Sequence, residues 1–80
     1  MLHKDLIALI EQGIIEKIVI GRPAPNLSWT VAGYGANLPH DIVNRIELNH
    51  EGCIRMWADL DAAYAFIRKC GFQRSILIEG

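Results

Sequence analysis

One short pattern occurs twice in this chain: an amphipathic segment, a glycine, a large apolar residue and then a run of aliphatic residues. Gly13 precedes the aliphatic residues 18–20, and Gly71 precedes residues 76–78. Glycine adopts the left-handed conformation that ends many helices, so each copy of the pattern predicts a helix followed by a strand. The repeat has two interpretations: two αβ units that pack both helices on one sheet face, or the common chemistry of any helix-to-strand turn.

Two helices are predicted from apolar side chains at 3.6-residue spacing. The first covers about residues 2–12, and its apolar stripe consists of Leu2, Leu6, Leu9 and Ile10. The second begins at Asp59 or Asp61, either of which can cap it. Its buried stripe is predicted to be Leu60, Ala63, Tyr64 and Ile67. Arg68 and Lys69 in its last turn complement the helix dipole.

Runs of β-branched or alternating residues predict the strands. They cover residues 14–20, 27–34, 42–49, 53–57 and 75–78. The segment 42–57 has two interpretations, a tight hairpin or one long bent strand, and in either case Ile46 and Leu48 should point inward. The element order α-β-β-β-(β)-α-β predicts an α+β fold with a mainly antiparallel sheet of about four or five strands. Both helices should pack on one face of this sheet.

The chain has 80 residues, which predicts a single domain, residues 1–80. Eight basic and nine acidic residues give a net charge of −1, spread without runs. This balance does not favour a nucleic-acid partner. The apolar run at residues 6–10 is far shorter than the ~20 residues that cross a bilayer, and Asp5 interrupts any signal-peptide core. We therefore expect a cytoplasmic protein with no membrane partner.

The cysteines and histidines do not have the spacing of a metal site. Only His50 and Cys53 lie near each other, whereas a structural zinc site needs two such pairs. A cysteine nucleophile needs a neighbouring base, and Cys53 is a better candidate than Cys70, yet a turn position explains both Cys53 and His50. We expect no enzyme activity, no cofactor and no metal, with both cysteines buried as small apolar side chains.

Three arginines alternate with apolar residues in the predicted strands: Arg45, Arg55 and Arg74. Together with Trp29 and Trp57 they form the candidate interaction surface. One interpretation is a solvated sheet face with paired charges, and the other is a stacking platform for single-stranded nucleic acid to which Tyr34 also contributes. The tryptophans can equally serve as core or interface anchors.

The final aliphatic run, residues 75–78, is the candidate site of self-association. If this strand lies at a sheet edge, its free backbone groups can pair with a second copy, because only Arg74 and Glu79 flank it. We therefore predict a homodimer. If the strand is central, the surface around Trp29 or Trp57 becomes the alternative interface.

A wider pattern combines these elements. In the C-terminal half it comprises residues 53–63, with an arginine-bearing strand that ends in an aromatic residue, then residues 66–68 and 71–72. In the N-terminal half it comprises residues 8–10, 13, 18–23, 29 and 34–35. This pattern resembles the small ParC-like partition-associated proteins of plasmids and integrative elements.

The resemblance implies a non-enzymatic accessory protein of a mobile genetic element, acting in plasmid partition or maintenance. It also implies a partition-system protein as a partner, and it carries over no functional residues. From the residues alone, the alternative is a small nucleic-acid-binding regulator that uses an arginine-bearing sheet face.

Overall fold

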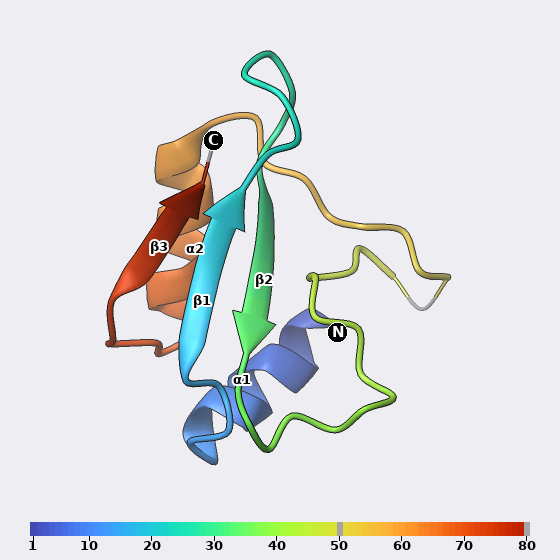
Figure 1. Cartoon of the computed structure of the whole chain (residues 1–80), viewed down its shortest axis with the longest axis vertical. Helices are drawn as coiled ribbons and strands as arrows, with labels where there is room; N and C mark the ends of the chain where they lie inside the picture. The colour runs from blue at the N-terminus through green and yellow to red at the C-terminus, as the bar shows by residue number, and fades with distance from the viewer. Residues whose placement is uncertain (50, 80) are drawn as a thin grey trace.

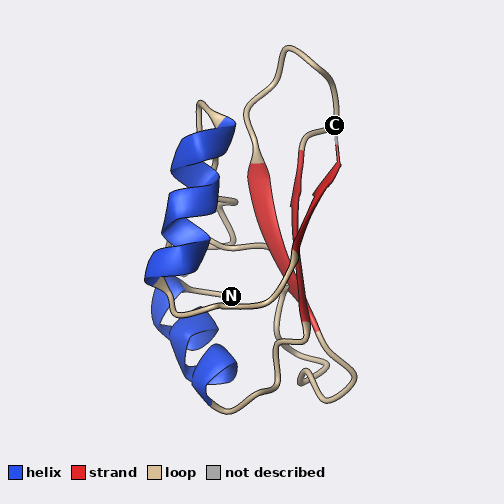
Figure 2. Cartoon of the chain, turned by 90° about the vertical axis from the view of Figure 1, so that its left-hand side faces the viewer, coloured by secondary structure: helices blue, strands red, loops and turns tan. Residues whose placement is uncertain are grey.

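The structure, a computed structural model, describes residues 1–49 and 51–79 (Figure 1). Its elements in chain order are α1 (His3–Glu11), β1 (Lys17–Gly21), β2 (Thr30–Tyr34), α2 (Leu60–Lys69) and β3 (Ile76–Glu79). The strands form one sheet in the order β2-β1-β3, in which β1 runs antiparallel to β2 and parallel to β3. Both helices lie on one face of the sheet (Figure 2), and the opposite face is called the open face below.

This sheet corrects the predicted one. The class is α+β, but the expected mainly antiparallel sheet of four or five strands is wrong, because the described sheet has three strands and mixed directions. The observed order is α-β-β-α-β. The parallel pair follows from the repeated pattern, since α1–β1 and α2–β3 place their helices on the same face and run in the same direction. Strands built in that way lie parallel when they become neighbours.

Residues 42–57 do not form the predicted strands. Two limbs of this segment run antiparallel, and they meet at an isolated bridge between Glu47 and Ile54. Leu48 N–H donates to the Cys53 carbonyl at 2.6 Å. The chain therefore reverses direction between these two residues, as in a hairpin, but the limbs do not form a regular ladder of hydrogen bonds. The part of the predicted turn at His50 lies outside the described residues.

Met1 explains why the inner limb is irregular. Its amino group donates to the carbonyl oxygens of Val43 (2.7 Å) and Arg45 (2.8 Å) and lies 3.3 Å from a carboxylate oxygen of Glu47. Glu47 is therefore drawn inward, and Leu48 is 67% exposed rather than inward-facing. Long-range polar contacts thus override the alternation of this segment.

The same segment covers the outer edge of β2. Ile46, which is buried as predicted, donates its N–H to the Val31 carbonyl at 3.0 Å. Trp29 and Trp57 exchange backbone hydrogen bonds of 2.8 and 2.9 Å. At the outer β2 edge the Val31 carbonyl and both backbone groups of Gly33 are therefore paired, although the pairing partner is not a strand.

The core lies between the sheet and the helices. Its fully buried large side chains are Leu6, Ile18, Ile20, Val31, Ile46, Ile67 and Phe72. Each contributes about 1.5–3 kcal/mol by burial of its side chain. No helix among the described residues has the length and apolarity needed to cross a membrane.

The helix ends match the local predictions. Gly13 has φ 74° and Gly71 has φ 96°, so the expected left-handed glycines are confirmed. At the first of these, Ile14 N–H donates to the Leu9 carbonyl at 2.9 Å, which is the closure of a Schellman motif. At the start of α2, Asp59 is the cap and accepts a 2.7 Å hydrogen bond from the N–H of Ala62.

Candidate interaction surface

β3 is an edge strand with a free outer side. Among residues 1–49 and 51–79, no strand lies beyond it (Figure 1). Arg22 N–H donates to the Glu79 carbonyl at 3.3 Å, so the backbone of Glu79 faces β1. Because the backbone groups of successive residues alternate in direction, those of Ile76 and Ile78 face outward.

The side chains of this edge are apolar and exposed. Leu77 is 47% exposed and Ile78 is 52% exposed. Leu77 pairs with Val19 and lies on the open face, while Ile78 pairs with the buried Ile20 and lies on the helix-covered face. An edge strand with outward-facing backbone groups and apolar side chains is a ready site for addition of another strand.

Arg68 holds in place the connection between α2 and this edge strand. Its guanidinium donates to the carbonyl oxygens of Phe72 (2.8 Å) and Arg74 (2.9 Å), and to the Tyr64 hydroxyl (2.9 Å). These bonds tie the connection before β3 to the last turn of α2. The sequence predicted only a helix-dipole role for Arg68, because spacing along a helix does not show which loop carbonyls will fold back onto it.

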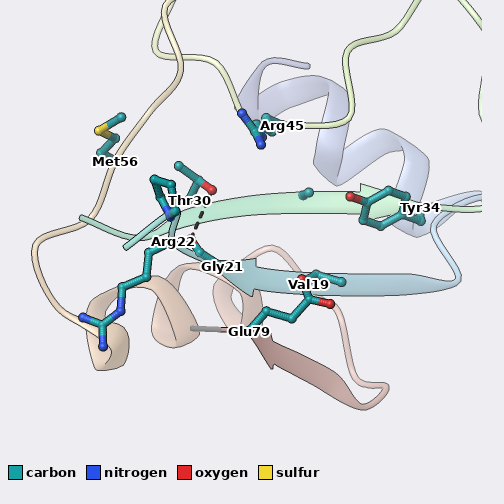
Figure 3. Close-up of a pocket in the computed structure, with 10 residues that line it drawn as sticks. Val19, Gly21, Arg22, Thr30, Tyr34, Arg45, Met56 and Glu79 are labelled. Atoms are coloured by element: carbon teal, nitrogen blue, oxygen red, sulfur yellow. Dashed lines mark hydrogen bonds between the residues drawn. The ribbon is translucent and has the colours of Figure 1, made fainter. Parts of the chain in front are cut away.

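The open face carries a shallow hollow of about 300 Å³. Val19 and Ala32 lie on its floor, because they alternate with the core-facing residues of β1 and β2. Arg45 and Met56 approach from the segment above β2, and Glu79 lies along the other side (Figure 3). The hollow can therefore accept an apolar group, and its lining holds two cationic residues, Arg22 and Arg45, and one anionic residue, Glu79.

A second shallow hollow, of about 590 Å³, lies beside the start of β3. Its lining includes two basic residues, Lys17 and Arg74, and the acidic Glu16, together with Ser75 and Leu77. Lys17 also lies over the Tyr34 ring, with its Nζ 5.2 Å from the ring centre. The N-terminal end of the β3 edge thus has two basic neighbours and one acidic neighbour, whereas its C-terminal end carries Glu79.

The structure brings together three of the five residues proposed from the sequence. Trp29 and Trp57 are 8% and 7% exposed and lie in the core, joined through their backbones. The guanidinium of Arg55 covers Trp57 at 4.8 Å. Arg22, which the sequence did not single out, covers Trp29 at 4.1 Å, and no hydrogen-bond partner is found among the described residues for its buried Nε.

Arg45 and Arg74 lie apart from this cluster. Arg45 is on the open face, because it bridges to Ala32 of β2. Arg55 contacts Phe66 of α2 and so belongs to the helix-covered side. Arg74 lies in the connection that leads into β3. The arginines are separated because residues 42–57 and 72–75 do not form the strands whose alternation would align them.

The two cysteines differ in environment. Cys70 is buried, and this burial raises the pKa of its thiol, an effect that the charge of Arg55 partly opposes. Cys53 is exposed, so the expectation that both would be buried is wrong for Cys53, which lies at the chain reversal rather than in a strand. The described residues contain no group of three or more metal-ligating side chains. The His50–Cys53 pair cannot be placed, because His50 lies outside them.

No protein-family model, curated protein or solved structure matches this chain. Among the described residues, the fold leaves two surfaces uncovered. These are the apolar outer edge of β3 and the open face of the sheet.

Proposed function

We propose that this chain is a non-enzymatic interaction protein that forms a homodimer through the outer edge of β3. The observation that carries the proposal is the free edge itself. Ile76 and Ile78 direct their backbone groups away from β1, and Leu77 and Ile78 are about half exposed. Pairing with a second strand removes this apolar surface from water and satisfies the backbone groups.

A wider role is proposed from the resemblance to ParC-like partition-associated proteins. On this basis the dimer acts in the cytoplasm as an accessory protein of a mobile genetic element, in plasmid partition or maintenance. A partition-system protein is then its further partner. The neighbouring genes test this role: a partition ATPase gene next to the gene for this chain would support it, and the consistent absence of such a gene would argue against it.

Sedimentation velocity at micromolar concentration tests the dimer. We expect a species of twice the 9.0 kDa chain mass. A Leu77→Lys variant should sediment as a monomer, because a lysine on an edge strand opposes the addition of another strand. Leu77 is 47% exposed, so this variant should keep the circular dichroism spectrum of the parent.

The matched control is Leu48→Lys. Leu48 is 67% exposed and belongs to the segment on the other side of the molecule from β3 (Figure 1). It introduces the same charge on an exposed leucine and should leave the dimer intact. A monomeric parent protein, or a Leu77→Lys variant that stays dimeric, would refute the proposed interface.

One observation favours a second candidate, a nucleic-acid-binding regulator. Arg45 and Lys17 both lie on the open face, and Tyr34 on the same face is 41% exposed. A basic surface with an exposed ring can bind single strands by phosphate contact and stacking. A gel shift with single-stranded DNA tests this function. Binding should weaken steeply with added salt and be lost in Arg45→Glu, and absence of a shift at low salt excludes it.

A further inference from the structure

We infer that β3 pairs antiparallel with β3 of a second copy, with Ile76 opposite Ile78 of the second copy and Leu77 opposite its own counterpart. The inference rests on the proposed self-association and adds the orientation, the register and the charged contacts of that interface. The two sheets then form one continuous sheet across both copies, with all helices on the same face.

The backbone directions fix the register. In an antiparallel ladder, the residues whose backbone groups face the neighbour exchange both N–H···O bonds with the residue opposite. On the outer side of β3 these residues are Ile76 and Ile78. Pairing Ile76 with Ile78 of the second copy satisfies every outward group within Ile76–Glu79. A shift by two residues pairs Ile76 or Ile78 with itself and moves the other bonds beyond the strand.

The exposed leucine is central in this register. The Leu77 backbone faces β1, so two Leu77 residues form a non-hydrogen-bonded pair, in which Cα atoms approach to ~4.5 Å and side chains are closest. Leu77 is 47% exposed and lies on the open face, where nothing among the described residues covers it fully. On the other face, Ile78 meets the half-buried Ile76 of the second copy. Both faces of the interface are therefore apolar.

The charges favour the antiparallel orientation. Glu79 lies on the open face, beside Val19 (Figure 3). In the inferred register it stands opposite Ser75 of the second copy, next to the hollow whose charged lining residues are Lys17, Arg74 and Glu16, with a net positive charge. A parallel pair of β3 strands would instead place one Glu79 beside the other, and like charges in adjacent positions destabilise strand pairs.

Single cysteines in β3 test the register by disulfide formation. The background is Cys53→Ser, because Cys53 is the exposed native thiol and Cys70 is buried. Leu77→Cys should form a covalent dimer under mild oxidation by glutathione, since its Cα separation suits a disulfide. Ile76→Cys and Ile78→Cys alone should give only background cross-linking. In this register the Cα atom of residue 76 lies about 8 Å from that of residue 76 in the second copy, and the same holds for residue 78. This separation exceeds the ~7 Å limit for a disulfide.

A mixture of Ile76→Cys and Ile78→Cys chains provides the positive control, because these residues stand opposite each other. Circular dichroism confirms that each variant is folded before oxidation. If sedimentation shows a dimer but Ile76→Cys or Ile78→Cys alone cross-links better than Leu77→Cys, the register is wrong while the proposed function stands. If the Cys53→Ser parent sediments as a monomer, the proposed function and the register both fail.

The charged contacts give a second measurement. Glu79→Lys should raise the dimer dissociation constant about fivefold or more, because it places a lysine beside the hollow of the second copy, where the basic Lys17 and Arg74 outnumber the acidic Glu16. The double variant Glu79→Arg with Arg74→Glu should restore much of the affinity. A dissociation constant unchanged by Glu79→Lys would overturn the antiparallel placement of the charges.

Discussion

Replacement of Arg68 by alanine should destabilise the fold far more than its position on a helix surface suggests. The guanidinium donates to two loop carbonyls and one hydroxyl, and the bond to Phe72 is the partly buried one. A net hydrogen bond to a charged group contributes about 1.5–3 kcal/mol. The exposed bonds to Arg74 and Tyr64 contribute less because water competes for them, so we expect a total loss of about 2 kcal/mol.

Thermal unfolding at one fixed protein concentration measures this loss, since association changes the apparent stability. For a domain of this size, about 2 kcal/mol corresponds to a fall in Tm of about 8–16 °C. Lys69→Ala is the matched control, because it removes the same charge from the same helical turn at an exposed residue. Its effect should stay within about 0.5 kcal/mol. Equal losses for Arg68→Ala and Lys69→Ala would show that only the helix dipole matters.

Four further predictions concern the turn at Gly71, the two cysteines and metal binding. Gly71→Val should lower the free energy of unfolding, measured in urea, by about 1–2 kcal/mol. The loss comes from backbone strain alone, because φ is 96° and an added Cβ would meet no atom within 4 Å. Gly71→Asn should lower the free energy of unfolding less, and equal losses for the two variants would contradict this cause. Iodoacetamide should modify Cys53 in the folded protein and Cys70 only after unfolding, as peptide mass spectrometry will show. Burial holds the pKa of the Cys70 thiol in the folded chain above its pKa in the unfolded chain. The unfolded chain therefore loses this proton first, and the free energy of unfolding should fall as the pH rises above about 8.5. A Cys70→Ala variant with the same pH dependence would argue against this assignment. A strong chelator should leave Tm unchanged, since the described residues hold no three-ligand group, and a fall of several degrees would reveal a metal.

The local features of the fold could be predicted from the sequence. Gly13, Gly71 and Asp59 end or begin helices through hydrogen bonds to residues no more than five positions away. Such contacts depend on residue type and spacing, both of which the sequence displays. The edge position of the last strand, on which the dimer prediction depends, also agrees with the sheet order.

The pairing of distant segments could not be predicted in the same way. The choice of β3 as the parallel neighbour of β1 depends on where both helices pack, which no short window contains. The contact between Met1 and Glu47 joins residues at opposite ends of a long stretch of chain, and it turns an apparently alternating strand into an irregular segment. The burial of Trp29 and Trp57 follows from the same segment, because its return over β2 places the two rings in the core.

The irregular cover along β2 also limits how far assembly can proceed. A sheet with two unpaired edges accepts a new neighbour at each side, and repeated addition then builds an open filament. In this molecule, residues 44–46 and Trp57 occupy the far edge, so the described sheet leaves one edge available. Once that edge is used, neither copy can recruit a third chain by strand addition. A segment too irregular to count as a strand can thus block strand addition at the edge that it covers, and this protects a small, apolar-rich protein from polymerisation.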